Sequence, residues 1–449
     1  PHPLNMDALE IAITVSLLLH CKIVDEVHFM RKIVIDGSNT SGFQRTALIG
    51  LNGYIDTEFG RIDIPTVCLE EEAARKIDEK EGYAVYRLDR LGIPLIEIST
   101  APQLTTPEQV KKVAEMIGFV LRSTKRVKRG LGSIRQDLNI SIDGKRVEVK
   151  GVSRLNLLEK ISRYEAERQK MLLDLSKELK DLKFDFKEGD VTHIFNNTKS
   201  KIIKNGIGNN NRVYALYVSN LAGYLKSEKY RLGKELAEIV RVLGIGGLFH
   251  TDELPAYGIS EQEVNDLKKF FNAGERDAII FVVADLNKAK TAISMLIERI
   301  KKAKEGITEE TRGPRDDGTT EFLRPLPGRE RMYPETDIPP VKITEEMIER
   351  IRKNLPKSFE ETVEEFSKKY GISKQQAYQI INNDLDETFV KLYEIYGNGN
   401  VISRTLINTI SEIEKDGYDT TKIDEDVLSK IFLFLKNGYI VKDGIPYIL

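Results

Sequence analysis

The spacing of apolar residues changes along the chain, and these changes limit the folds that it can adopt. Behind Asn5, which can cap a helix, apolar residues recur at helical spacing to about Cys21. From Glu26 to Leu69, short runs rich in Val, Ile and Thr alternate with turn-forming residues, a pattern typical of antiparallel strands. Beyond Thr344, apolar residues again recur at helical spacing. The sequence therefore predicts an α+β chain with more than one domain.

The same pattern predicts where the domains begin and end. Two strands that turn at Asp143-Gly144 are predicted to be the last strands of a β-rich core with flanking helices. A stretch rich in lysine and asparagine follows this core. A stretch rich in proline, glycine and charge follows and is expected to form an extended functional loop that returns to the first core. The predicted segments are a first core at 1–187, an inserted α+β domain at 188–305, a return segment at 306–342 and a helical domain at 343–449.

The composition limits which partners the protein can bind and in which cellular compartment it can fold. The 68 basic and 70 acidic residues nearly cancel, so any contact with nucleic acid must come from local patches. The only two cysteines, Cys21 and Cys68, exclude a disulfide framework or a four-cysteine zinc site and fit a reducing cytoplasm. The longest apolar stretch, residues 9–24, is shorter than the roughly 20 residues of a membrane span and predicts a buried helix.

Acidic residues at two strand positions form the sharpest candidate site. Glu70, Glu71 and Glu72 end one predicted strand, and Glu97 lies inside the apolar strand Pro94–Ile98. A charge inside an apolar strand is costly unless it is paired or bound to a cation. Carboxylates that approach one another from strands suit Mg²⁺, which prefers oxygen ligands and can hold substrate phosphates. The alternative, which stays open, is a solvated acidic segment and a salt-bridged Glu97.

Two further regions could bind phosphate. The loop Gly37–Arg45 begins like a Walker motif but lacks its lysine and hydroxyl pair, so it disfavours a P-loop ATPase. Ser41 and Arg45 could still present a hydroxyl and a charge to an anion, although an ordinary hairpin loop has the same composition. Basic residues also crowd the segment Arg122–Arg135, for which a phosphate partner and a solvated face are the two alternatives.

Polar residues on the next two strands extend this hypothesis. Arg135 and Asp137 alternate with apolar residues and should share one face of a strand, and Lys150 should project similarly from the strand that follows. A nucleophile is not evident, because the five histidines are scattered and neither cysteine has an activating neighbour. The segment His250–Glu253 could be a metal or acid–base site, or a loop in which Asp252 caps a turn.

Six segments of the chain, taken in order, resemble the B/E family of tRNA-dependent amidotransferase proteins. They are Pro3–Asn5, Leu69–Glu71, Pro94–Ile98, Gly132–Ser141, Val147–Lys150 and Arg331–Pro340. The segment 190–304, with Gly246–Pro255, resembles an insert domain that the E branch of the family shares with bacterial-type aspartyl-tRNA synthetases, and it favours that branch.

The resemblance implies a fold, a reaction and a set of site residues. The fold is a β-rich, kinase-like cradle with an inserted domain and a C-terminal helical domain. The reaction uses ATP and Mg²⁺ to phosphorylate the side chain of glutamate carried by tRNA(Gln), after which ammonia displaces the phosphate. The implied metal ligands are Glu70, Glu71 and Glu97, the catalytic residues are Glu70, Glu97, Arg135 and Asp137, and Asn139 and Lys150 are implied contacts for the nucleotide. Ser41 and Arg45 join them as nucleotide-binding candidates on the composition of their loop alone.

The resemblance also implies partners. Ammonia would come from an asparaginase-like glutaminase, the D-type partner of the E branch, in a heterotetramer of two D and two E chains. Family members begin with a Gly-Leu-Glu-Ile-His segment and end in a tail domain, so both ends of this chain are expected to be missing. The competing hypotheses are a non-catalytic tRNA-binding accessory protein and a synthetase fragment, and the absence of class II synthetase motifs disfavours the fragment.

Overall fold

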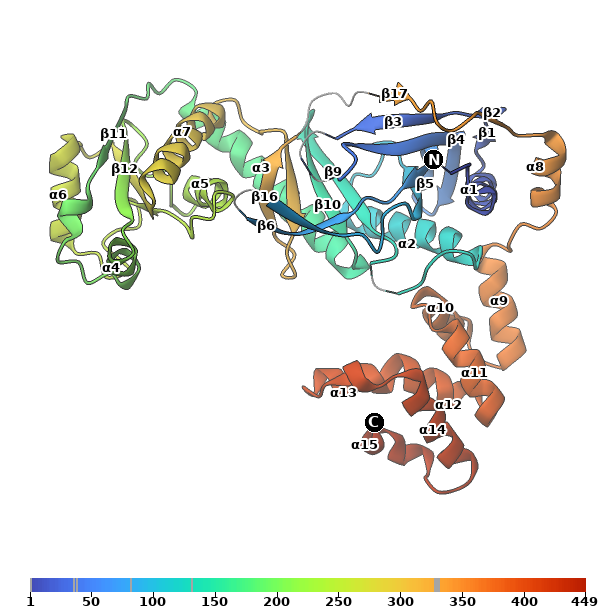
Figure 1. The fold of residues 1–449 in the computed structure, drawn as a ribbon. Helices are drawn as coiled ribbons and strands as arrows, with labels where there is room; N and C mark the ends of the chain where they lie inside the picture. Colours follow the sequence, from blue (N-terminus) through green and yellow to red (C-terminus); the bar gives the residue numbers. More distant parts are fainter. Residues whose placement is uncertain (1, 35–36, 38, 81–82, 131, 327–331) are drawn as a thin grey trace. The chain divides into compact units, whose positions relative to one another are not determined.

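The computed structural model describes residues 2–34, 37, 39–80, 83–130, 132–326 and 332–449, and it is a mixture of helices and sheets (Figure 1). The predicted α+β class is therefore confirmed, whereas the inserted-domain arrangement stays a prediction. The chain divides into two compact units. The first contains residues 1–105, 112–133 and 330–449, and the second contains residues 106–111 and 134–329.

An antiparallel sheet forms the centre of the first unit. Its strand order is β17-β3-β4-β5-β8, and β1 also pairs with β4. Its strands are β1 (Lys22–Ile23), β3 (Phe29–Ile33), β4 (Phe43–Thr57), β5 (Gly60–Glu71), β8 (Pro94–Ser99) and β17 (Met332–Pro334). A separate two-stranded ribbon contains β6 (Arg75–Lys80) and β7 (Tyr83–Arg87). The strand predicted around Glu97 and those predicted between Glu26 and Leu69 are thus confirmed.

Helix α1 (Met6–Leu18) packs closely on this sheet. The side chain of Asn5 accepts a hydrogen bond from the backbone N of Ala8 at 3.0 Å, which confirms the predicted cap. Apolar side chains of α1, among them Leu9 and Ile13, are fully buried. Gly53 of β4 has no side chain where the chain leaves α1, and a Cβ atom there would collide with the carbonyl oxygen of Leu19. This close approach therefore requires glycine.

The return segment is more regular than the sequence predicted. β17 pairs with β3, and β18 (Val341–Lys342) pairs with β2 (Glu26–Val27), so two short strands of this segment pair with strands near the start of the chain. The prediction of an extended loop was wrong for residues 310–325, which form a hairpin of β15 (Glu310–Pro314) and β16 (Thr320–Pro325). The charged residues suggested a loop, but those of β15 are buried in ion pairs instead of solvated.

Residues beyond Thr344 are helical, as predicted. The helices are α8 (Glu345–Arg352), α9 (Phe359–Tyr370), α10 (Lys374–Asn382), α11 (Asp386–Tyr396), α12 (Gly399–Arg404), α13 (Ile410–Lys415), α14 (Glu425–Lys436) and α15 (Ile445–Ile448). Their core surrounds Phe389 and Phe432 and includes Phe119 of α2 (Pro107–Ser123). None of the helices in the described part of the chain is long and apolar enough to cross a membrane.

The second unit contains two four-stranded sheets. One has the order β16-β15-β10-β9, and its hairpin of β9 (Gln136–Asp143) and β10 (Lys145–Val152) confirms the turn predicted at Gly144. The other has the order β11-β12-β14-β13, with apolar clusters that draw on alternate residues of β12 and β14. Its elements are β11 (Phe186–Asp190), α4 (Lys201–Gly208), β12 (Arg212–Val218), α5 (Leu232–Arg241), β13 (Phe249–His250), α6 (Glu261–Phe271), β14 (Ala278–Ala284) and α7 (Leu286–Ala303).

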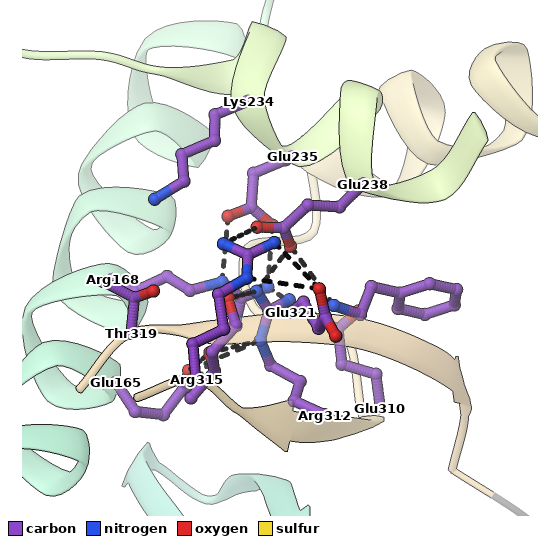
Figure 2. A network of polar contacts seen from close by, with 12 residues as sticks. Glu165, Arg168, Lys234, Glu235, Glu238, Glu310, Arg312, Arg315, Thr319 and Glu321 are labelled. Atoms are coloured by element: carbon purple, nitrogen blue, oxygen red, sulfur yellow. Dashed lines mark hydrogen bonds and ion pairs between the residues drawn. The ribbon is translucent and has the colours of Figure 1, made fainter. Parts of the chain in front are cut away.

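A buried network of charges joins these elements of the second unit (Figure 2). It links the long helix α3 (Leu155–Leu179) to α5, α7 and β15. Arg168 donates to both carboxylate oxygens of Glu235 at 2.8 and 2.7 Å, and Arg312 donates to Glu310 at 2.7 Å. The buried members are Glu165, Arg168, Glu235, Glu238, Arg299, Glu310 and Arg312.

Candidate active site

Glu70 and Glu97 lie together on one face of the sheet in the first unit. In the antiparallel pair of β5 and β8, Glu97 is opposite Cys68 and Glu70 is opposite Leu95, so the two glutamates are diagonal neighbours. Glu70 is buried, with 7% of its surface exposed, whereas Glu97 is exposed. Burial, and next the charge of Glu97, raise the pKa of Glu70 to about 7. The structure thus brings together the two carboxylates that the sequence singled out.

Two residues that the sequence did not single out contact this pair. Gln44 donates from Nε2 to Glu70 Oε2 at 3.2 Å and to the backbone oxygen of Glu71 at 2.9 Å. Lys32 Nζ lies 4.0 Å from Glu70 Oε1. Lys32 and Gln44 are directly opposite each other in β3 and β4, so both project to the face that carries Glu70. The two-residue period of the strand could have indicated Gln44, but the predicted residue was Arg45, one position further on.

Glu71 and Arg45 lie on the opposite face of the same sheet. Successive side chains of a strand point to opposite faces, so neither residue shares the face of Glu70. Arg45 Nη1 donates to Glu71 at 3.2 Å, and Arg45 Nε donates to Glu335 at 2.7 Å. The structure therefore does not bring Glu71 to the predicted metal pair, and it pairs Arg45 with carboxylates of its own chain.

The residues around Ser41 form a turn ahead of β4. Asn39 Oδ1 accepts hydrogen bonds from the backbone N of Ser41 at 3.0 Å and from its hydroxyl at 3.1 Å. This is a local Asx-type arrangement that fixes the Ser41 side chain near the start of β4. Ser38, Leu131 and Arg331, which belong to the sequence motifs of this region and of the strands that follow, lie outside the described residues.

The other predicted residues lie in the second unit and form a set of their own. Arg135 precedes β9, and Asp137 and Asn139 follow on the exposed side of that strand. Asp137 Oδ1 accepts from the backbone N of Gly151 at 2.8 Å. Asn139 is directly opposite Glu148, whose Oε1 lies 3.8 Å from Lys150 Nζ. Asp137, Asn139, Glu148 and Lys150 thus give one strand pair a polar, solvent-facing surface.

Two arginines of the basic segment, Arg126 and Arg129, have partners within the first unit. Arg129 Nη1 lies 3.1 Å from Asp384 and 3.2 Å from Asp386 of the helical region. Arg126 Nη2 lies 3.3 Å from Asp7. These pairs neutralise charges for which the sequence suggested either phosphate or solvent. The structure thus adds a third alternative, in which the segment binds carboxylates of its own chain.

The segment at His250 is a turn, as the simpler hypothesis predicted. Asp252 Oδ2 accepts from the backbone N of Gly223 at 2.8 Å and of Leu225 at 2.9 Å. His250 is buried, and its burial lowers its pKa. Asp252 therefore orders a neighbouring loop through backbone hydrogen bonds.

The donor set at Glu70 and Glu97 suits one kind of metal. Within the described ranges, no cluster of three or more His, Cys, Asp or Glu residues could hold a metal ion. Mg²⁺ commonly takes one or two carboxylates and completes its shell with water and substrate phosphates. A carboxyl whose pKa is raised by burial and by a neighbouring carboxylate also gains from a cation between them. The pair therefore fits Mg²⁺ better than a metal that needs a full protein cage.

Comparison with known proteins gives consistent matches over the chain. A family model described as the GatB/GatE catalytic domain matches residues 1–349. A glutamyl-tRNA(Gln) amidotransferase chain of the E type from Methanocaldococcus jannaschii is 48% identical over 100% of this chain and 73% of its own length. Proteins of the same description from Saccharolobus solfataricus and Archaeoglobus fulgidus are 47% and 46% identical, over 100% and 99% of this chain and 73% and 72% of their own lengths.

Proposed function

The chain belongs to the GatB/GatE catalytic domain family, among its E-type members, and from this premise we propose that it converts glutamyl-tRNA(Gln) to glutaminyl-tRNA(Gln). In this proposal, ATP phosphorylates the side-chain carboxylate of the glutamate on tRNA(Gln). Ammonia then attacks the acyl phosphate and releases inorganic phosphate, which leaves the amide. Such transfers depend mainly on positioning and on stabilising phosphate charge.

The observation that carries the proposal is the pair of carboxylates at Glu70 and Glu97. We assign both as ligands of Mg²⁺, which would offset the negative charge of the ATP phosphates when it is bound. Gln44 of the neighbouring strand β4 donates a hydrogen bond to the Glu70 carboxylate, and Lys32 of β3, one strand further away, lies 4.0 Å from it. The nucleotide role is not extended to Arg45, because its guanidinium pairs with Glu71 and Glu335 on the other face.

Residues of the second unit complete the proposal. The exposed polar strand surface that carries Asp137, Asn139 and Lys150, with Arg135 just before it, is proposed to contact the substrate. Guanidinium, amide and ammonium groups of this kind suit phosphate and carboxylate oxygens. Ser41, held at the start of β4, is proposed as a further contact for the nucleotide.

Partners and compartment follow from the chemistry. Among the described residues neither cysteine forms a disulfide, and burial raises the pKa of both thiols, which leaves them poor nucleophiles at neutral pH. We therefore propose that ammonia comes from a glutaminase partner, an asparaginase-like D-type chain, in an assembly of two D and two E chains. The proposed compartment is the cytoplasm, where thiols stay reduced.

Replacing Glu97 tests this function. The chain with its partner, glutamine, ATP, Mg²⁺ and glutamyl-tRNA(Gln) is expected to form glutaminyl-tRNA(Gln). Glu97→Gln removes a charge from an exposed strand position, so phosphoryl transfer should fall at least a hundredfold while tRNA affinity is retained. Asp63→Asn, which neutralises an exposed carboxylate further along β5, is the matched control.

Two outcomes would overturn the proposal. Unchanged turnover in Glu97→Gln would remove the role of the carboxylate pair. Wild-type binding of tRNA without ATP cleavage in the complete mixture would favour a non-catalytic accessory protein instead.

A further inference from the structure

Glu335 is a buried carboxylate whose acceptor positions are filled from two strands. Its side chain is 0% exposed, although it follows the short edge strand β17. Arg31 donates to both oxygens, from Nη2 at 2.6 Å and from Nε at 2.9 Å, and Arg45 Nε donates at 2.7 Å. The backbone N of Asp337 donates at 2.9 Å. A buried charge with four donors is strongly held in one position.

The two arginines would repel each other without this carboxylate. Arg31 and Arg45 are directly opposite in the antiparallel pair of β3 and β4, where like charges destabilise the pairing. Both guanidinium groups also lie over the ring of Phe43, at 4.8 and 5.3 Å from its centroid. Glu335 therefore holds β3 and β4 together on the face of the sheet that carries Arg31 and Arg45.

The next residues of the same two strands form the front of the sheet. Lys32 and Gln44 are directly opposite each other, adjacent in sequence to Arg31 and Arg45 respectively. Their side chains project to the other face, where Gln44 hydrogen-bonds to Glu70 and Lys32 approaches it. A shift of β3 or β4 at Arg31 or Arg45 must also move Lys32 or Gln44 on the other face, because adjacent residues of a strand share one rigid backbone.

We propose that Glu335 is a positioning residue of the candidate active site, which acts through the Arg31–Arg45 pair to hold Lys32 and Gln44 against Glu70. The inference rests on the proposed function, because it assumes that Glu70 and Glu97 bind a divalent cation. It adds a residue 265 positions away from Glu70 in the sequence to the machinery that fixes the ligand geometry. Glu335 itself touches neither substrate nor metal in this scheme.

The test is ion binding by the full chain, measured by calorimetry with Mn²⁺ as the probe and independent of turnover. Glu335→Gln keeps the size of the side chain but removes the charge that draws two guanidinium groups together. We expect Mn²⁺ binding about tenfold weaker. The KM for Mg·ATP in the complete reaction should rise similarly, with kcat reduced less, because the ligand is misplaced and not removed. Asp337→Asn is the control, because Asp337 approaches Arg31 alone, at 3.4 Å, and should leave Mn²⁺ binding unchanged.

A double-mutant cycle separates positioning from general loss of stability. If Glu335 acts through Gln44, then Glu335→Gln should add little to the Mn²⁺ binding defect of Gln44→Ala. Additive defects, or wild-type binding by Glu335→Gln, would overturn this inference while leaving the proposed function intact. Failure of the wild-type chain to bind Mn²⁺ would overturn the proposed function and this inference together. Should Glu335→Gln not fold, Arg31→Lys, which keeps the charge but loses the bidentate contact, gives the same measurement.

Discussion

Glu70 and Glu71 are consecutive residues of β5 that project to opposite faces of one sheet, Glu70 toward Gln44 at 3.2 Å and Glu71 toward Arg45 at 3.2 Å. Glu70 is buried beside a second carboxylate, whereas Glu71 faces a guanidinium. The same chemical change should therefore have opposite effects on stability at the two positions.

Glu70→Gln should stabilise the metal-free chain, and only at higher pH. The pKa of Glu70 is raised from 4.5 to about 7, so the folded state binds the proton more tightly than the unfolded state. The stability that Glu70 contributes is therefore fully present below pH 4.5 and is lost as pH rises toward 7. Removing the titrating group should gain roughly 1–3 kcal/mol at about pH 8 and almost nothing at about pH 4. Urea unfolding of both chains at the two pH values measures the difference.

Glu71→Gln provides the control for that experiment. It removes a partially exposed ion pair with Arg45, so the free energy of unfolding at about pH 8 should fall by less than about 1 kcal/mol. A loss of stability in Glu70→Gln at both pH values would contradict the assignment of the two residues to different faces.

The sequence identified the carboxylates but could not assign all their neighbours. Glu97 was found because a charge inside an apolar strand needs a partner, which is a local property of the sequence. Lys32 and Gln44 were missed because their place beside Glu70 depends on the register of three strands, which the sequence does not encode locally. For the same reason Glu71 was grouped with Glu70, although consecutive residues of a strand point to opposite faces of the sheet.

Glu335→Gln should also make the chain less stable near neutral pH and less sensitive to acid. The hydrogen bond from Arg31 is the main cause that lowers the pKa of Glu335 from 4.5 to about 2. Stability from this group is therefore present above pH 4.5 and is lost as pH falls toward 2. Thermal unfolding between about pH 2 and pH 6 should show a shallower acid dependence in the variant. If the melting temperatures of the two chains fell equally with pH, the buried ion pair between Glu335 and Arg31 would not explain the acid dependence.

Arg129→Met should weaken the fold of the first unit. Arg129 lies within 3.2 Å of Asp384 and Asp386, and its loss leaves Asp384 to the more distant Arg122, whose Nε lies 4.0 Å away. The free energy of unfolding should fall by about 1 kcal/mol, and less at high salt, where the pair is screened. Lys128→Met, at an exposed neighbouring position, is the control and should leave unfolding unchanged. An unfolding free energy that does not depend on Arg129 would return the basic segment to the phosphate or solvent alternatives.

The fold was predictable where apolar periodicity is regular and not where charges are buried. Asn5 and Thr344 precede helices that the sequence placed correctly, and their side chains accept backbone hydrogen bonds. Helix α3 was not anticipated, because Glu165 and Arg168 occupy core positions that interrupt its apolar pattern. The hairpin of β15 and β16 was mistaken for a loop for the same reason. A charged residue carries no local sign that its partner lies on a distant element.

Arg312→Met should destabilise the second unit strongly, because Arg312 is fully buried between Glu310 and Glu238 (Figure 2). Its removal leaves Glu238 to the more distant Arg315, at 3.9 Å, and Glu310 to Arg168. Buried negative charge is then less well compensated, which costs about 3–5 kcal/mol. Adding Glu238→Gln to Arg312→Met should recover part of that loss, since one uncompensated charge is removed with it. Arg163→Met, on the exposed side of α3, should change little. Chemical unfolding of the four chains measures these differences. Equal effects of Arg312→Met and Arg163→Met would mean that the network is solvated in solution, and the buried charges would then not explain why α3 and β15 pack as they do.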